Sequence, residues 1–425
     1  MGTNKPTGTF RAFRNRNYAL FFCGQSVSQI GTWMQRAAVT WVVYTITHSA
    51  FMVGLTIFAQ QFPSFLLSLF GGIVSDRYSR YKILLVTQTA SMLQAMAMAA
   101  LALTGHLVVW QLLTLSVVLG VINAFDVPAR QPMVHDMVND KADLPNALAL
   151  NSAMVNIARV LGPVLSMTVL QLFGAGICFV SNAVSFLAVL ASLVLMKFPP
   201  YKRNTVQKKA IAELAEGFAY LKRTPAMRGV ILLISIVSLT VFPYDTLVPV
   251  FAKVVFQGNA KTFGYISSCM GLGAITGTLF LASLKKGADL KIVLLVNCVV
   301  LSISLMIFSR TAFLPLALSV AVVCGFGMMS LSTISITLIQ VNAAPDMRGR
   351  MMSYVALGFF GMLPIGSIIV GAVSQRIGAP DTMLCQGIIG LVIAVAFSPF
   401  LRRDKLNKAE MAGMTEVEKE IAEKV

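Results

Sequence analysis

The sequence predicts an all-α membrane protein whose twelve transmembrane helices form two pseudo-symmetric six-helix bundles. Three observations support this fold class. The 425 residues are 56% hydrophobic and only 12% charged, whereas a soluble globular chain carries about 25% charged residues. Twelve apolar segments are long enough to span a bilayer, and a polar stretch divides them into two sets of six. Lys and Arg concentrate in alternate loops, which is typical of membrane topology.

A transmembrane helix needs about 20 predominantly apolar residues. By this measure we expect spans at 18–46, 50–73, 82–104, 107–128, 146–172, 175–196, 228–256, 262–284, 291–309, 312–340, 351–375 and 381–401. These spans define an N-terminal lead-in, two bundles joined by a linker, and a C-terminal tail, at 1–17, 18–197, 198–227, 228–401 and 402–425. Within the linker, Ile211, Leu214, Phe218 and Leu221 recur at helical spacing. This pattern predicts an amphipathic helix that lies on a membrane face or on the bundle.

The distribution of basic residues predicts the orientation in the membrane. If the N-terminus is inside, the inner segments hold 28 of the 34 Lys and Arg residues and the outer loops hold four. The remaining two, Arg36 and Arg159, lie within spans. The positive-inside rule therefore places both termini in the cytoplasm. The lead-in is polar and basic, so we expect a cytoplasmic segment there rather than a cleaved signal peptide.

The two sets of spans resemble each other weakly. Lys82-Ile83-Leu84-Leu85-Val86 opens the third span, and a similar run beginning at Lys291 opens the ninth, 209 positions later. Together with the six-plus-six arrangement, this offset favours two repeats in parallel orientation.

Several classes of function find no support in the sequence. The net charge of +17 comes from short loops rather than from a basic soluble module, so we expect no nucleic-acid partner. The six cysteines form no C-x-x-C pair, and the three histidines lack metal-ligand spacing. No P-loop motif is present. We therefore expect no metal, no cofactor and no ATP hydrolysis.

A dense group of charges joins the second and third spans in the pattern Gly72-x-x-x-Asp76-Arg77-x-x-Arg80. This pattern resembles the loop 2–3 motif of the major facilitator superfamily, with Ser79 where the family usually has glycine. Further runs are similar to the branch that includes enterobactin exporters and macrolide efflux proteins, namely those at 31–35, 125–131, 146–152, 159–163 and 348–350. Within them, Gly162-Pro163 is similar to half of the family's antiporter motif.

The resemblance covers essentially the whole chain and implies a function. It implies a monomeric, non-enzymatic transporter of the cytoplasmic (inner) membrane, which moves a small molecule by alternating access. The branch implies export of an amphipathic, drug- or siderophore-like compound in exchange for protons. An importer or facilitator on the same fold, and a non-transporting membrane sensor, remain alternatives.

The resemblance also assigns an inner gate to the charges at the cytoplasmic side. In the superfamily the loop acid caps the N-terminus of span eleven, and the following base pairs with an acid low on span four. The matching residues here are Asp76 and Arg77, with Asp126 as the acid on span four and Arg130 one helical turn later. The alternative is that these charges only anchor the loop in water.

Polar residues inside two spans are candidates for a substrate or proton pathway. Gln25, Gln29, Thr32 and Arg36 form one stripe on span one. Span five carries Ser152, Asn156 and Arg159 at i, i+4 and i+7. Polar side chains in lipid face the interior of the bundle. The alternative for each amide is a structural interhelical hydrogen bond, worth about 0.6 kcal/mol.

Asp245 is the acid that lies deepest in the second half, in a segment that Pro243 and Pro249 should disrupt. Arg36 lies 209 positions earlier, at the offset of the repeat. We therefore hypothesise that Arg36 and Asp245 attract one another across the interior when the outer side closes, and that protonation of Asp245 releases them. The alternatives are that each residue pairs locally or that Asp245 faces an outer vestibule.

Overall fold

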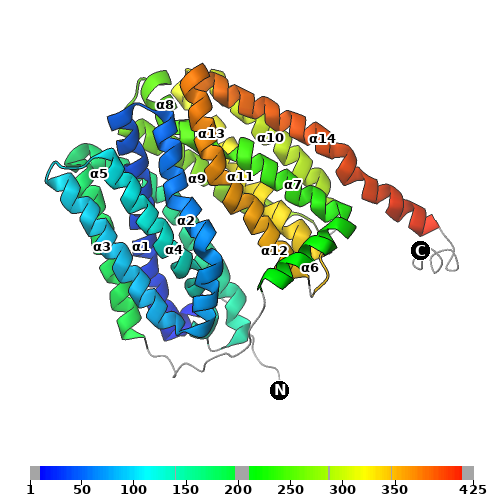
Figure 1. Cartoon of the computed structure of the whole chain (residues 1–425), viewed down its shortest axis with the longest axis horizontal. Helices are drawn as coiled ribbons and strands as arrows, with labels where there is room; N and C mark the ends of the chain where they lie inside the picture. The colour runs from blue at the N-terminus through cyan, green and yellow to red at the C-terminus, as the bar shows by residue number, and fades with distance from the viewer. Residues whose placement is uncertain (1–9, 139, 197–209, 286–287, 346, 414–425) are drawn as a thin grey trace.

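The computed structural model describes residues 10–138, 140–196, 210–285, 288–345 and 347–413, and every regular element in these ranges is a helix (Figure 1). Ten helical segments of the described chain are long and apolar enough to cross a membrane. The first half begins with a short 3-10 helix, η1 (Arg11–Arg14). Its long helices are α1 (Arg16–Thr47), α2 (Ala50–Arg77), α3 (Arg80–Leu103), α4 (Val109–Met137) and α5 (Leu144–Leu195).

Helix α5 contains two of the predicted spans. Its 52 residues would reach about 78 Å at 1.5 Å per residue, far more than the hydrocarbon core of a bilayer. Gly174 interrupts the helix with φ 84° and ψ 173°, a conformation that glycine adopts at little cost. The backbone therefore turns at Gly174 and divides α5 into two arms, residues 144–173 and 175–195. The ten candidate segments count α5 once and leave out α1. When the two arms of α5 are counted separately and α1 is added, the total equals the twelve predicted spans.

The second half follows a short amphipathic helix, α6 (Ala210–Arg223). This helix lies within the predicted linker, although Ile211 and Leu214 belong to the part whose side chains are not described. Its continuous spans are α9 (Ala260–Ser283), α10 (Leu290–Arg310), α11 (Leu314–Asn342) and α14 (Ala379–Gly413).

Two spans of the second half are broken helices. The first passes from α7 (Pro225–Thr240) through a 3-10 turn, η3 (Phe242–Leu247), and α8 (Val248–Val250) to a π-turn, η4 (Phe251–Val255). Pro243, with ψ 16°, lies in the 3-10 turn, which confirms the predicted disruption. The second passes from α12 (Arg348–Ala356) through a π-turn, η5 (Leu357–Gly361), to α13 (Met362–Ile377).

The junction between α2 and α3 is tighter than the sequence indicates. We predicted a loop between residues 73 and 82, but α2 continues to Arg77 and α3 begins at Arg80. Only Tyr78 and Ser79 link the two helices. Asp76 and Arg77 therefore occupy the last helical turn of α2. The helix dipole stabilises a basic side chain at this position.

The two ends of the helix bundle differ in charge, and we name them accordingly. The basic end is where α2 meets α3 and α12 begins, and it carries Arg77, Arg80, Arg130, Arg348 and Arg350. The far end is where α1 meets α2 and α13 meets α14. The start of α1 and α6 lie toward the basic end, in the lower part of each half in Figure 1. There Glu216 of α6 forms an ion pair with Arg350 of α12.

Each half has its own hydrophobic core. Tyr18, Phe21, Leu84, Met133 and Phe186 represent the core of the first half near the basic end. A larger core fills the second half. The residues that the first half contributes to it are Ala37, Trp41, Ala50 and Met167. Because these four lie in the half of each helix toward the far end, the two halves share their apolar packing there.

Candidate functional site

Three side chains from two helices meet at Trp33 in the middle of the first half. The guanidinium carbon of Arg36 (α1) lies 5.4 Å from the centre of the Trp33 ring, and that of Arg159 (α5) lies 5.1 Å from it. Cation–π contacts of this kind stabilise a desolvated cation. The Nε atom of each arginine is buried and has no hydrogen-bond partner. Neither arginine is fully satisfied by the protein.

Arg159 also reaches the second half. Its Nη1 atom lies 3.8 Å from Sδ of Met329 on α11. The neighbouring Met328 accepts a hydrogen bond of 3.5 Å from the Tyr244 hydroxyl of η3. The interior between the halves is therefore lined at this level by an indole, two guanidinium groups, a phenol and two thioethers.

Asp245 supplies the acidic group of this central cluster, which we define as Trp33, Arg36, Arg159, Tyr244 and Asp245. Its side chain is exposed, whereas its neighbours Tyr244 and Thr246 are buried. The broken helix at η3 thus turns the carboxylate toward open space. Among the described residues no ion pair joins Asp245 to Arg36 or to Arg159, so the attraction between Arg36 and Asp245 stays a prediction.

The remaining pathway candidates lie at different depths around the cluster. Gln25 is buried, and its Oε1 atom has no hydrogen-bond partner. Gln29 and Asn156 are half-buried. Ser152 is exposed and donates to the Leu148 carbonyl of its own helix at 3.0 Å. Of these four, Ser152 is the one for which the structure gives a hydrogen bond within its own helix.

A buried amide network that the sequence analysis missed lies beside the cluster. Gln35 Nε2 donates to Gln94 Oε1 at 3.0 Å, and Asn182 Nδ2 donates to Gln35 Oε1 at 2.8 Å. These residues join α1, α3 and the second arm of α5. Gln35 was visible in the 31–35 run as a polar residue on an apolar span. Its partners could not be found, because no sequence spacing connects residues on different helices.

Gly162 and Pro163 lie where three helices cross. A Cβ atom at Gly162 would overlap Cβ of Trp33, and Ser166, one turn later, donates to the Met34 carbonyl at 2.8 Å. The Pro163 carbonyl faces Gly264 of α9. The antiporter-like pair therefore lets α5 approach α1 on one side and α9 on the other, and it places Arg159 next to Trp33.

The acid on α4 is held within its own half. Asp126 is 3% exposed, and its Oδ2 atom lies 3.2 Å from Nε of Arg130. Its Oδ1 atom accepts hydrogen bonds from Thr87 Oγ1 at 2.9 Å and from Gln88 Nε2 at 2.7 Å. Asp126 therefore fastens α3 to α4. The Arg77–Asp126 pair that the resemblance implies is not formed among the described residues.

The motif residues at the end of α2 and the start of α3 divide into packed and open positions. Arg77 is exposed, and Arg80 forms a 3.0 Å ion pair with Asp136 of α4. Ser75 donates to the Pro128 carbonyl at 3.1 Å. A Cβ atom at Gly72 would meet nothing within 4 Å. Asp76 is exposed and makes a polar interaction of its own. Asp76 and Arg77 therefore lie at the surface of the basic end, whereas Ser75 is buried against α4.

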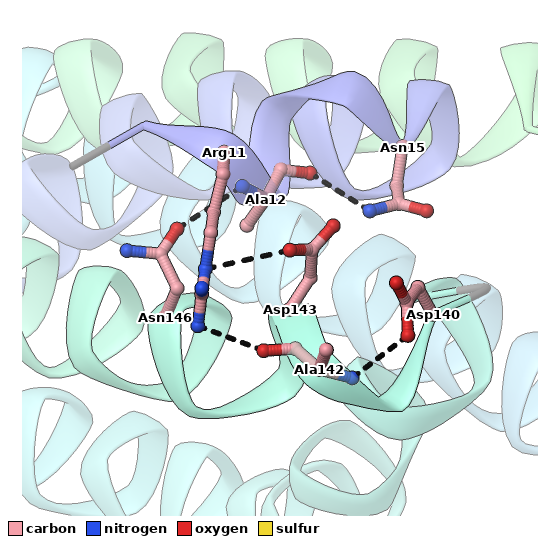
Figure 2. A network of polar contacts seen from close by, with 7 residues as sticks. All are labelled: Arg11, Ala12, Asn15, Asp140, Ala142, Asp143 and Asn146. Carbon is pink, nitrogen blue, oxygen red and sulfur yellow. Dashed lines mark hydrogen bonds and ion pairs between the residues drawn. The ribbon is translucent and has the colours of Figure 1, made fainter. Parts of the chain in front are cut away.

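A second polar network at the basic end ties the N-terminus to α5 (Figure 2). Arg11 pairs with Asp143 at 3.4 Å and donates to the Ala142 carbonyl at 2.8 Å. The backbone N–H of Ala12 donates to Asn146 Oδ1 at 3.0 Å. Asn146 is the first residue of the 146–152 run, which resembles the efflux branch. In this structure Asn146 anchors η1 through its hydrogen bond to Ala12.

At the far end, α2 of the first half packs closely on α13 of the second. A Cβ atom at Gly54 would overlap the Ser367 carbonyl, and one at Gly371 would lie 2.6 Å from the Ala50 carbonyl. Gln375 donates a hydrogen bond to the Ser49 hydroxyl. Glycine is required at this crossing because the two backbones nearly touch.

A second crossing, between α5 and α9, completes the contact between the halves. Ser268 of α9 donates to the Val160 carbonyl of α5 at 2.6 Å. A Cβ atom at Gly271 would lie 3.2 Å from the Arg159 carbonyl. Trp41 of α1 stacks on Phe263 of α9 with ring centres 5.6 Å apart. The contact therefore runs from the far end to the level of Arg159.

In the part of the chain that the structure describes, no three His, Cys, Asp or Glu side chains lie close enough together to bind a metal ion. A groove of about 700 Å³ lies elsewhere, between α2, α3 and α4. All of its lining residues belong to the first half. It is therefore separate from the central cluster.

Comparisons with known proteins agree with this architecture. The family model described as transmembrane secretion effector matches residues 7–425. The staphyloferrin A transporter of Staphylococcus aureus is 26% identical over 398 residues, which cover 92% of this chain and 98% of that protein. The enterobactin exporter of Salmonella typhi is 25% identical over 393 residues, covering 90% and 92%.

Among solved structures, a POT family transporter crystallised with a thioalcohol-conjugated peptide aligns with a TM-score of 0.73 at 13% identity. The alignment covers 91% of this chain and 96% of that one, and it shows the same fold. Together, the family model and the relatives identify a multi-pass membrane transporter rather than an enzyme. The chain therefore belongs to the transmembrane secretion effector family of the major facilitator superfamily, and it is related to the efflux branch of that superfamily.

Proposed function

We propose that this protein exports a small amphipathic organic compound across the cytoplasmic membrane in exchange for protons. The observation that carries the proposal is the central cluster, where Arg159 of the first half contacts Met329 of the second, and the adjacent Met328 accepts a hydrogen bond from Tyr244, the neighbour of Asp245 in the chain. A site shared by both halves is what alternating access requires, because relative movement of the halves then changes the site itself. In this proposal residues 18–197 and 228–401 are the two moving bodies and the protein acts as a monomer.

The positive-inside rule supports the orientation. The basic end carries most of the loop Lys and Arg residues and would therefore face the cytoplasm, with both termini on that side. The close helix crossings lie toward the far end. The described arrangement would then be sealed on the outer side and available from the cytoplasm, as an exporter needs for loading.

Coupling to protons follows from the charge of Asp245. In this proposal an ionised Asp245 attracts the Arg159 guanidinium across the two halves while the far end is closed. Opening of the far end would draw α5 away from α11 and η3 and remove that attraction. Proton binding to Asp245 cancels the same attraction, so proton uptake and outer opening would favour one another. Closure would then release the proton toward the cytoplasm.

The charges at the basic end form the proposed inner gate. Gly72, Asp76, Arg77, Arg80, Asp126 and Arg130 lie on α2, α3 and α4, facing away from the sealed end. We propose that α2 approaches α12 when the basic end closes, and that the open side of Gly72 permits this approach. Asp76 would then lie near the N-terminus of α12, which favours an acid.

The chemistry of the cluster supports the class of compound. Trp33, Tyr244 and the two methionines offer apolar and aromatic surface, while Gln29, Asn156 and the two arginines offer hydrogen-bond donors. A drug-like or siderophore-like molecule combines these properties. The relatives include proteins named as a staphyloferrin A transporter and an enterobactin exporter. One proton that descends about 100 mV supplies about 2.3 kcal/mol, enough for a gradient of roughly 50-fold.

The test uses everted membrane vesicles and a compound found by growth sensitivity of cells with and without the gene. We expect an acid-inside vesicle to accumulate the compound and to lose part of its pH gradient, which a fluorescent dye reports. Asp245→Asn should remove the dependence on the pH gradient but retain exchange of labelled for unlabelled compound. Accumulation that is independent of the gradient in the unmodified protein would contradict proton coupling. Uptake only in right-side-out vesicles would indicate an importer.

A further inference from the structure

The groove between α2, α3 and α4 has the dimensions and charges of a ligand site, yet transport by the central cluster does not use it. Its volume is about 700 Å³. Its walls are mostly apolar and include Val74, Ile83, Val86, Ile122 and Phe125. A polar rim, formed by Arg77, Tyr78, Ser79 and Lys82, closes it toward the basic end.

The two basic side chains on this rim are available. Arg77 and Lys82 are both exposed, and within the described residues neither forms an ion pair. Ser79 is the N-cap of α3, but its side chain makes no capping hydrogen bond. The first backbone N–H groups of a helix attract anions, and here two cations lie beside them. The rim therefore favours an anionic group with several acceptor oxygens.

The apolar part of the groove runs the depth of one lipid leaflet. A second hollow of about 400 Å³ shares Val86 and Ala90 with the groove and extends along α3 to Leu93. From Lys82 to Leu93 the helix rises about 16 Å. Half of a hydrocarbon core measures about 15 Å. Val86 and Leu93 are 68% and 56% exposed, so the hollow opens toward the membrane rather than toward the other half.

We propose that this groove binds one anionic phospholipid from the leaflet at the basic end. The phosphate lies between Arg77, Lys82 and the start of α3, and one acyl chain follows α3 past Ala90 toward Leu93. Basic pockets between transmembrane helices recognise anionic headgroups in this manner. A zwitterionic lipid would fill the apolar part equally well but would not neutralise both bases.

The lipid would also act on the neighbouring charges. Thr87 lines the groove and donates a hydrogen bond to Asp126. A phosphate on Arg77 would hold this guanidinium at the rim and away from Asp126, which keeps Arg130 as its partner in the described arrangement. The lipid therefore stabilises the state in which the basic end is open.

The experiment measures lipid binding to the purified full-length protein by native mass spectrometry. Phosphatidylglycerol and phosphatidylcholine with identical acyl chains are titrated separately. We expect one phosphatidylglycerol to bind about fivefold or more tightly than phosphatidylcholine, and Lys82→Gln to reduce this preference by about fivefold. The matched control is Lys291→Gln, at the equivalent position of the second half, where Lys291 already makes another interaction. It should leave the preference unchanged.

A second pair of variants tests the acyl-chain part of the groove. Ala90→Phe fills the shared segment and should weaken binding of both lipids at this site. Ala100→Phe is exposed on the same helix but outside the groove, and it should not. Equal binding of the two lipids to the unmodified protein, or equal losses in Lys82→Gln and Lys291→Gln, would overturn the proposal. Binding requires no transport, so failure of the exporter proposal would leave this result intact.

Discussion

The far end and the basic end of this protein are built from the same helices but are held together differently. At the far end α2 crosses α13, and their backbones meet at Gly54 and Gly371. At the basic end the same α2 carries Gly72, where a Cβ atom would meet nothing within 4 Å. The comparison shows that α2 and α13 can close the far end of the molecule while the basic end stays open.

The kinds of contact differ as well. The far end joins the two halves through close backbone crossings and hydrogen bonds such as that from Gln375 to Ser49. At the basic end the described ion pairs join elements within one half, as Arg80 of α3 and Asp136 of α4 do, or fasten α6 to α12. Contacts between the halves can therefore be broken at one end without unfolding either half.

The largest effect should come from filling the crossing at the far end. In Gly54→Ala the new methyl group would overlap the backbone carbonyl of Ser367, which cannot move without displacing α13. Overpacking of this kind costs about 1–3 kcal/mol, which corresponds to a shift of roughly 5- to 150-fold toward arrangements with the far end open. Labelling of a cysteine at Trp41 by a membrane-impermeant maleimide should accelerate accordingly.

The matched control for this substitution is Gly72→Ala, on the same helix at the other end. Its methyl group meets nothing within 4 Å, so labelling at the far end should stay at the unmodified rate. If Gly54→Ala and Gly72→Ala accelerated labelling at the far end equally, the close crossing at Gly54 would not be what keeps that end closed.

A smaller effect, and one confined to the first half, should follow from Asp126→Asn. This change removes the charge that pairs with Arg130 and that strengthens the bonds from Thr87 and Gln88. Hydrogen bonds to a charged group are worth about 1.5–3 kcal/mol, so the apparent melting temperature in detergent should fall by a few degrees. Labelling at the far end should be unaffected.

Arg77→Gln serves as the control for Asp126→Asn, because Arg77 forms no ion pair with the residues that the structure describes. It should leave the melting temperature unchanged. If Asp126→Asn left the melting temperature unchanged but altered labelling at the far end, Asp126 would belong to the gate rather than to the internal fastening of one half.

Most of the fold could be predicted from the sequence, because hydropathy reports directly on the cost of placing each residue in lipid. The two arms of α5 were predicted as separate spans, although no proline marks the turn at Gly174. The end of α2 was placed four residues early, since Ser75, Asp76 and Arg77 lower the hydropathy without ending the helix.

The site was harder to predict because it depends on which helices are neighbours. The sequence analysis identified Arg36, Arg159 and Asp245 as charges within spans. It paired Asp245 with Arg36 by the offset of the repeat, but an offset along the chain does not fix which side chains meet between the two halves. Trp33 lies in the 31–35 run, which the sequence analysis used only for its similarity to the efflux branch. Nothing in this run indicates that the Trp33 indole contacts Arg36 and Arg159.

The central claim is that the two ends open in alternation, and paired spin labels test it most directly. One pair, at the exposed residues His48 and Arg376, reports on the far end, and another, at Tyr78 and Gly349, reports on the basic end. The exposed Cys23 and Cys385 are replaced first. Distances are then measured in lipid nanodiscs by pulsed electron resonance at neutral and at acidic pH. We predict that acidification lengthens the His48–Arg376 distance and shortens the Tyr78–Gly349 distance together. Distances that stay fixed, or that lengthen at both ends at once, would contradict the account.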